Sequence, residues 1–169
     1  FAYFNLGLVH QELKQYQSAL INYQKAIKLD PKNHFAYNNI AICYEKLEDY
    51  KNSIFFFEKT ININPEFIDA YINISLIYKK IKNLTLAKEW LNKAISIDNK
   101  NFKVYFNLAG IYKIEDNLKE AIKFYEKSIQ LNKNNYYSYY NLGNIYREVR
   151  DYEKSKYNYY QALELNKNF

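Results

Sequence analysis

An asparagine returns every 34 residues along this chain, each time inside the same short phrase. The phrase begins with tyrosine and ends with an aliphatic and a small residue: YFNLG at 3–7, YNNIA at 37–41, YINIS at 71–75, YFNLA at 105–109 and YYNLG at 139–143. The asparagines are Asn5, Asn39, Asn73, Asn107 and Asn141. A primary amide both donates and accepts hydrogen bonds, so it can pair with the N–H and C=O groups of a peptide main chain. The spacing therefore predicts five equivalent amides, provided that the surrounding elements repeat too.

The same period divides the whole chain into five units. With Tyr3 taken as the fourth residue of a unit, the units are residues 1–33 (lacking the first residue), 34–67, 68–101, 102–135 and 136–169, without insertions. In the first unit Tyr3, Leu6, Gly7 and His10 stand at i, i+3, i+4 and i+7, which predicts a helix over about 1–13. A second helix is predicted in each unit, near 17–29, 51–63, 85–97, 119–131 and 153–165. The pattern therefore indicates an all-α chain of ten helices.

Small and large residues alternate between the two helices of each unit. The small residue of the first helix is Gly7, Ala41, Ser75, Ala109 or Gly143, and the large residue of the second is Tyr23, Phe57, Leu91, Tyr125 or Tyr159. Such pairs let the two helices interlock. The polar turns between them place Asp49, Asn83, Asn117 and Asp151 where they can cap the second helices. No unit can bury its apolar face alone, so neighbouring units must stack.

This pattern resembles the tetratricopeptide repeat family over the whole chain. The period, the small residues, the aromatic residues and the LDPKN phrase at 29–33 carry the resemblance. It implies a right-handed α-solenoid of five helix-turn-helix units with ten antiparallel helices, whose first helices line a concave groove. Departures are mild: Tyr3 replaces the usual tryptophan, His10 replaces a tyrosine, and only the first two units close with proline, Pro31 and Pro65. Pentatricopeptide RNA binders fit less well, because their unit is slightly longer and lacks these small residues.

The first-helix face opposite the core is unexpectedly apolar. A surface helix should be polar there, yet the residues beside the asparagines are Phe4, Leu8, Asn38, Ile42, Ile72, Leu76, Phe106, Tyr140 and Asn144. Apolar groups left in a groove imply a partner that covers them. Stacked helices lie about 8–10 Å apart and an extended chain advances about 3.3 Å per residue. We therefore predict that the groove binds an extended peptide, with one asparagine for roughly every three peptide residues.

Other interpretations of this face remain open. The asparagines could be inherited copies that bond only to a neighbouring helix. The clamp by which co-chaperone repeats hold acidic chaperone tails does not fit, because its first lysine and asparagine are replaced by Phe4 and Leu8, or in later units by Asn38 and Ile42 or Ile72 and Leu76. A modest cationic strip at the groove's edge suits an acidic peptide or RNA phosphates, although solvated lysines are the commoner explanation. It comprises Lys79, Lys80, Lys113 and Arg147.

Composition excludes several other classes of function. The net charge of +6 is spread along the chain rather than gathered in a run. Cys43 is the single cysteine, so no intrachain disulfide can form, and we expect it to be buried and the chain to work in a reducing compartment, the cytoplasm. His10 and His34 have no second ligand at metal-binding spacing. No phosphate loop or catalytic group of residues occurs, so we expect no enzyme activity in this segment, no metal and no cofactor.

The leading hypothesis is a protein-interaction scaffold that binds an extended peptide or unstructured segment in the groove. A first alternative is the substrate-recognition arm of a larger enzyme such as a protein glycosyltransferase, because the asparagines resemble those of O-GlcNAc transferase repeat arrays. A second is an RNA-binding helical repeat. We expect a protein partner, neither nucleic acid nor membrane, and association between copies through exposed terminal repeats. The chain begins inside a repeat, so we interpret it as a fragment of a longer protein.

Overall fold

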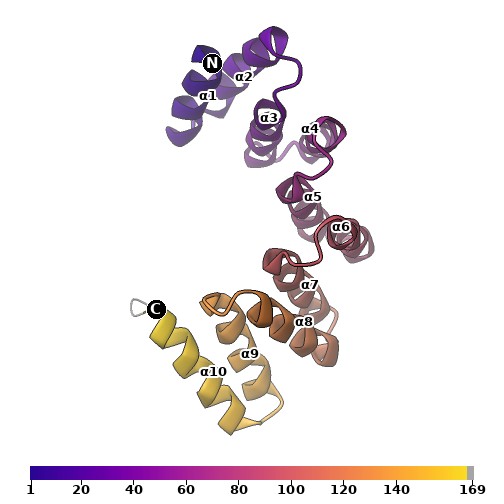
Figure 1. The fold of residues 1–169 in the computed structure, drawn as a ribbon, viewed down its shortest axis with the longest axis vertical. Coiled ribbons are helices and arrows are strands. Elements are labelled where there is room, and N and C mark those ends of the chain that lie inside the picture. Colours follow the sequence, from indigo (N-terminus) through magenta and orange to yellow (C-terminus); the bar gives the residue numbers. More distant parts are fainter. Residues whose placement is uncertain (167–169) are drawn as a thin grey trace. The chain divides into compact units, whose positions relative to one another are not determined.

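The computed structural model describes residues 1–166, which contain ten helices and no strand (Figure 1). The helices are α1 (Ala2–Glu12), α2 (Tyr16–Leu29), α3 (His34–Lys46), α4 (Tyr50–Ile63), α5 (Ile68–Lys80), α6 (Leu84–Ile97), α7 (Phe102–Ile114), α8 (Leu118–Leu131), α9 (Tyr136–Glu148) and α10 (Tyr152–Leu165). The predicted all-α fold of five helix-turn-helix units is confirmed. Each second helix ends at the predicted residue and begins one residue earlier than predicted.

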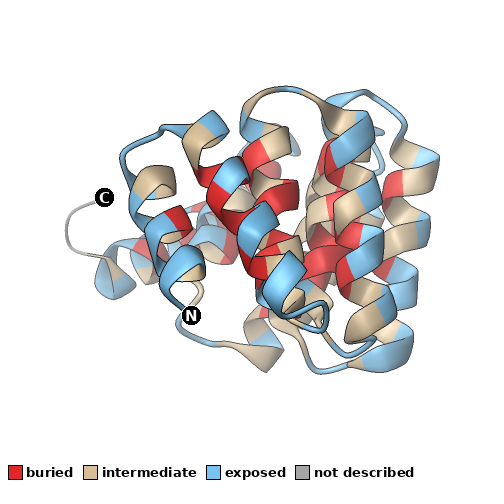
Figure 2. Cartoon of the chain, turned by 90° about the horizontal axis from the view of Figure 1, so that it is seen from above, coloured by how far each residue is buried: buried red, intermediate tan, exposed pale blue. Residues whose placement is uncertain are grey.

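The helices group into two compact units. The first comprises α1–α5 and the second begins with α6. Within each unit every helix packs against the next along the chain, and buried residues gather where helices face one another (Figure 2). One buried cluster of the first unit, on α2 and α3, is Ala19, Leu20, Tyr23, Ile40 and Cys43. One of the second unit is Ala109, Ala121, Tyr125, Leu142, Ile145 and Tyr146. Each cluster joins successive repeats, so neither depends on a single helical hairpin.

Small first-helix residues allow the helices of a hairpin to approach closely. A Cβ atom added to Gly7 would lie 2.5 Å from the ring of Tyr23, and one added to Gly143 would lie 2.7 Å from the ring of Tyr159. In the α3–α4 hairpin the Ser53 hydroxyl donates to the Ala41 carbonyl over 2.8 Å. The glycine–tyrosine contacts confirm the predicted interlock of small and large residues in the α1–α2 and α9–α10 hairpins, and the Ser53 bond joins two small residues in the α3–α4 hairpin.

Side chains cap three of the second helices, α4, α8 and α10, as predicted. Asp49 accepts a hydrogen bond from the backbone N–H of Asn52 over 3.1 Å, and Asn117 and Asp151 make the equivalent bonds at α8 and α10. Bonds from the Asn52 side chain and backbone hold the pKa of the Asp49 carboxyl below its usual value. Such caps satisfy N–H groups that the first turn of a helix leaves without a partner.

The turns between the two helices of a repeat contain a feature that the sequence analysis missed. The residue two positions after each first helix adopts a left-handed conformation with φ between 58° and 62°: Lys14, Glu48, Lys82, Asp116 and Arg150. The following N–H donates to a carbonyl five residues back, as from Asp49 to Tyr44 over 2.9 Å. This arrangement closes a helix and usually places glycine at that position. None of the five residues is glycine, so the sequence offered no cue.

Candidate functional site

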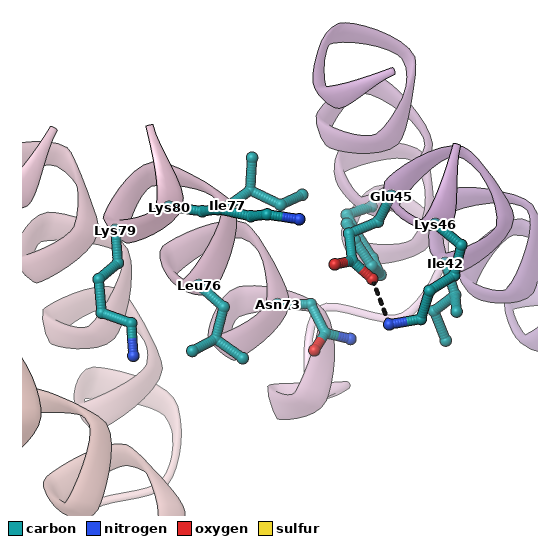
Figure 3. Close-up of a pocket in the computed structure, with 9 residues that line it drawn as sticks. Ile42, Glu45, Lys46, Asn73, Leu76, Ile77, Lys79 and Lys80 are labelled. Atoms are coloured by element: carbon teal, nitrogen blue, oxygen red, sulfur yellow. Dashed lines mark ion pairs between the residues drawn. The ribbon is translucent and has the colours of Figure 1, made fainter. Parts of the chain in front are cut away.

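A pocket opens between α3 and α5 on the first unit (Figure 3). Its volume is about 500 Å³. Helix α3 contributes Ile42, Glu45 and Lys46, α4 contributes Phe57, and α5 contributes Asn73, Leu76, Ile77, Lys79 and Lys80. Phe57 is only 1% exposed, so its ring forms the base of the pocket. The volume and the mixture of apolar walls with a few polar groups are typical of ligand-binding pockets.

Three of the predicted groove residues meet in this pocket. Ile42 comes from one helix, and Asn73 and Leu76 come from the next first helix along the chain. Ile42 and Leu76 occupy equivalent positions of successive repeats and Asn73 lies on the same face of its helix, which is why helical periodicity could group them. Lys79 and Lys80 were predicted only as part of a cationic strip, and Glu45, Lys46, Phe57 and Ile77 were not predicted to line the groove. Phe57 could have been predicted, because it was identified as a large residue that packs against the first helix, and such a residue lies beneath the groove.

Three of the five repeated asparagines each donate one amide N–H to another group of the protein. The Asn39 amide donates to the Tyr23 hydroxyl over 3.3 Å. The Asn107 and Asn141 amides each donate to the carbonyl four residues back on their own helix over 2.8 Å. These bonds agree in part with the structural alternative for the asparagines. The amide oxygens of Asn107 and Asn141, and the second N–H of all three amides, nevertheless make no other hydrogen bond within residues 1–166. The Asn39 oxygen, in contrast, accepts from Asn38.

Asn73 differs from these three asparagines. Its side chain makes no hydrogen bond with any residue between 1 and 166, and in Figure 3 it extends into the pocket. One repeat earlier, Tyr23 supplies the hydroxyl that holds Asn39. At the equivalent position before Asn73 stands Phe57, which has no hydroxyl. Asn73 therefore presents its full donor and acceptor capacity beside an apolar surface.

Positive side chains outnumber negative ones around the pocket. Glu45 forms an ion pair with Lys46 over 3.0 Å. Lys80 lies 3.9 Å from Glu48, and its ammonium stands over the Tyr50 ring, 5.1 Å from the ring centroid. The ammonium of Lys79 forms no ion pair within the described residues, and burial lowers its pKa. The pocket thus holds three lysines and one glutamate, with one cation left uncompensated.

Asn38 and Ile72 contribute less surface than the helical wheel suggested. Asn38 is 8% exposed and Ile72 is 5% exposed. The Asn38 amide donates to the Asn39 side-chain oxygen over 3.3 Å, while its own oxygen is buried without a partner within residues 1–166. A wheel gives the direction of a side chain but not what neighbouring elements cover, so it overstated the accessible area at these two positions.

The remaining predicted residues of the first unit lie on its first repeat. The Phe4 ring packs on the Tyr23 ring with a centroid separation of 5.7 Å, and Leu8 packs against the cluster that contains Tyr23. Asn5 is exposed and does not line the α3–α5 pocket. These residues therefore stand apart from the pocket.

On the second unit, aromatic side chains cover the corresponding face. Phe106 packs edge-on against Tyr125 at 5.7 Å, and Tyr140 lies 6.0 Å from Tyr159. The Tyr159 hydroxyl donates to Asn144 over 2.8 Å. Burial raises the pKa of Tyr125 to about 12, so this phenol remains neutral at physiological pH. The predicted residues Phe106, Tyr140 and Asn144 are thus engaged with second-helix tyrosines.

The described residues offer no clear metal site, membrane-spanning helix or reactive thiol. No group of His, Cys, Asp and Glu side chains between residues 1 and 166 is placed to hold a metal ion. None of the described helices is both long and apolar enough to cross a membrane. Cys43 is fully buried, as predicted, and burial raises its pKa to about 11. A buried neutral thiol of this kind is a packing group rather than a nucleophile.

Solved structures with the same fold include three helical-repeat proteins. PilF of Pseudomonas aeruginosa gives a TM-score of 0.85 at 19% identity, covering 98% of this chain and 75% of its own. A MamA fragment from Desulfovibrio magneticus gives 0.77 at 18% identity, covering 98% and 94%. YrrB, described as a TPR protein with an unusual peptide-binding site, gives 0.67 at 22% identity, covering 98% and 86%. At these identities the likeness shows the fold alone.

Sequence comparison identifies the family. No curated protein matches the sequence at a significant level. Family models described as tetratricopeptide repeat match residues 1–33, 34–67, 68–101 and 101–168, which together span nearly the whole chain. These matches fall on the helical hairpins already described, and they carry the same spacing of small and aromatic residues. The chain belongs to the tetratricopeptide repeat family.

Proposed function

We propose that this protein-interaction scaffold binds an extended peptide or unstructured segment at the α3–α5 pocket. The observation that carries the proposal is the Asn73 amide, which has no hydrogen-bond partner among the described residues and extends into an apolar-walled pocket. A polar group beside an apolar surface forgoes hydrogen bonds whenever an occupant displaces its water. The favoured occupant is therefore one that supplies both a donor and an acceptor, which a peptide main chain does at every residue.

The pocket suits such an occupant in shape as well. Ile42 from α3, Phe57 from α4 and Leu76 from α5 all line the space. An apolar side chain of the peptide would bury its surface against these groups, at about 25 cal/mol for each Å² removed from water. Side chains alternate along an extended chain. One side chain would thus enter the pocket while the adjacent main chain meets Asn73.

A structural neighbour gives this proposal an independent parallel. YrrB shares the fold and is described as having a peptide-binding site. Its identity to this chain is 22%, so the parallel concerns what the fold can support, not which residues do so. The residues proposed here come from the geometry of the α3–α5 pocket.

The test is a selection from a display library of random 12-residue peptides, followed by titration of the enriched peptides. We expect Asn73→Ala to weaken binding about tenfold, the effect of losing roughly 1.4 kcal/mol of hydrogen bonding. Asn141→Ala is the matched variant, because the amide of Asn141 already donates to its own helix. It should change affinity less than twofold. Equal losses in both variants, or no enrichment by the parent protein, would contradict the proposal.

A further inference from the structure

We infer that the bound segment carries an aspartate or glutamate whose carboxylate pairs with Lys79, beside an apolar side chain that enters the α3–α5 pocket. This inference rests on the proposed function, since it specifies the chemistry of the peptide that the same pocket takes. It assigns to Lys79 a recognition role that neither the fold nor the family membership implies.

The first support is the contrast between Lys79 and two other lysines, the partly buried Lys88 and the exposed Lys80. Lys88 lies 2.6 Å from Glu115 and stands over the ring of Tyr112. Lys80 has both Glu48 and the Tyr50 ring nearby. Lys79 is partly buried too, yet it forms no ion pair with any residue that the structure describes. Its charge loses solvation in the free protein without gaining an internal partner.

The second support is the distribution of charge across the pocket. On the α3 side, the carboxylate of Glu45 is paired with Lys46 and would repel an acidic group. On the α5 side stand Lys79 and Lys80 with no carboxylate among the lining residues of that helix. The electrostatic complement of the pocket is therefore an anion placed toward the C-terminal end of α5. A partly desolvated carboxylate–ammonium pair is stronger than one in open water.

The third support is the spacing along α5. Asn73, Leu76 and Lys79 follow one another at three-residue steps, and their side chains extend to one side of the helix in Figure 3. At a rise of 1.5 Å per residue, Asn73 and Lys79 lie about 9 Å apart along the axis. An extended chain covers that distance in about three residues. The acidic residue should therefore stand about three positions from the residue whose main chain pairs with Asn73, with the apolar residue between them.

The experiment begins with the same 12-residue peptide selection, now read for composition. We expect enriched peptides to carry Asp or Glu one or two positions from an apolar residue. A tight-binding peptide is then titrated beside its Glu→Gln or Asp→Asn counterpart by fluorescence anisotropy. With the parent protein, removing the peptide charge should weaken binding about tenfold, and the difference should shrink as salt screens the pair.

Protein variants assign the preference to Lys79. Lys79→Gln should reduce the difference between the charged and uncharged peptides to less than twofold, and Lys79→Arg should keep most of it. Lys28→Gln lowers the net charge equally from an exposed position on α2, so it should leave the full difference. Retained helicity by circular dichroism shows that each variant is folded.

The outcomes separate this inference from the proposed function. Enrichment of peptides without an acidic preference, or a preference that survives Lys79→Gln, overturns the role of Lys79 and leaves the peptide-binding pocket standing. A preference lost equally in Lys28→Gln also overturns it, since the general charge of the unit would then be responsible. If the parent protein enriches no peptide, both proposals are overturned.

Discussion

The α3–α5 face of the first unit and the α7–α9 face of the second carry asparagine at the same repeat position in different surroundings. On the first face the Asn73 side chain makes no hydrogen bond with any of residues 1–166, and it borders a pocket of about 500 Å³. On the second, Asn107 and Asn141 donate to their own helices. Aromatic side chains pack beside them, Phe106 on Tyr125 and Tyr140 on Tyr159.

Within the first unit, Asn39 and Asn73 differ because of the second-helix residue that lies below each of them. A tyrosine at the large second-helix position sends its hydroxyl toward the groove, where Tyr23 meets Asn39 and Tyr159 meets Asn144. Phe57 fills the same position under Asn73 without a hydroxyl. A repeated surface residue therefore does not mean a repeated site: a second-helix hydroxyl distinguishes Asn39 from Asn73, whereas Asn107 and Asn141 donate to their own helices.

The largest expected effect is loss of the base of the pocket. Phe57→Ala removes an almost fully buried ring, and we expect it to lower the free energy of unfolding by about 3–5 kcal/mol. Phe106→Ala, on the second face, removes a ring that is only partly buried and should cost less. Urea unfolding followed by circular dichroism measures both. Equal losses of unfolding free energy in the two variants would contradict this difference between the two faces.

The glycines of the first helices should respond in opposite directions. Gly143→Ala places a methyl group 2.7 Å from the Tyr159 ring, so we expect a loss of about 1–3 kcal/mol from overpacking. At Gly110 the nearest atom to an added Cβ is the Tyr125 hydroxyl at 3.7 Å, an ordinary contact. Gly110→Ala should then gain about 0.5–1 kcal/mol from improved helix propensity.

Thermal unfolding of the two glycine variants provides the measurement. A shift of the midpoint to lower temperature for Gly143→Ala and to higher temperature for Gly110→Ala is expected. Destabilisation by both variants would show that the interlock is equally tight throughout α7 and α9, contrary to the geometry.

The turns, unlike the faces, should behave alike in the two units. Glu48 and Asp116 both adopt φ near 60°, a conformation that costs a residue with a side chain about 1–2 kcal/mol. Glycine avoids this cost but loses more entropy on folding. We expect Glu48→Gly to gain about 0.5–1 kcal/mol and Asp116→Gly somewhat less, because aspartate tolerates this conformation better. Chemical denaturation would detect a destabilised variant, which would contradict the assignment of the turn.

The smallest expected effect is at Lys79. Its pKa is lower in the folded chain than in the unfolded one, so the folded state binds fewer protons, and the charged form makes the free protein less stable at neutral pH. This penalty disappears as the pH rises toward the unfolded pKa of about 10.4. Lys79→Met should therefore unfold at the same urea concentration as the parent at pH 7, or slightly above it.

Lys88→Met is the counterpart of the Lys79 variant on the second unit. It removes an ion pair of 2.6 Å and a contact with the Tyr112 ring, so it should be destabilising. A loss of stability in Lys79→Met comparable with that of Lys88→Met would mean that Lys79 has a structural partner.

Much of the fold could be predicted from the sequence because it depends on local periodicity. The helix ends, the caps at Asp49 and Asp151, and the glycine–tyrosine interlock follow from spacing and side-chain chemistry alone. The left-handed turn residues could not be predicted, since lysine or glutamate there gives no cue. Backbone hydrogen bonds across each turn, such as that from Asp49 to Tyr44, hold the left-handed conformation although no glycine is present.

The candidate site was predictable only in part. Helical register grouped Ile42, Asn73 and Leu76, which the pocket brings together. Register could not distinguish Asn73 from Asn39, because their surroundings differ through a hydroxyl on another helix. Nor could it show that Ile72 is almost fully buried, since burial depends on neighbouring elements that a single helix does not encode.

The most direct test of the central claim is Phe57→Tyr. The substitution places a hydroxyl under Asn73 in the position that Tyr23 occupies under Asn39, and it leaves every residue of α5 unchanged. If the unpartnered amide of Asn73 binds peptide, the new hydroxyl should satisfy it in advance and weaken the selected peptide about tenfold, with helicity retained. Unchanged affinity in a folded Phe57→Tyr protein would contradict the account.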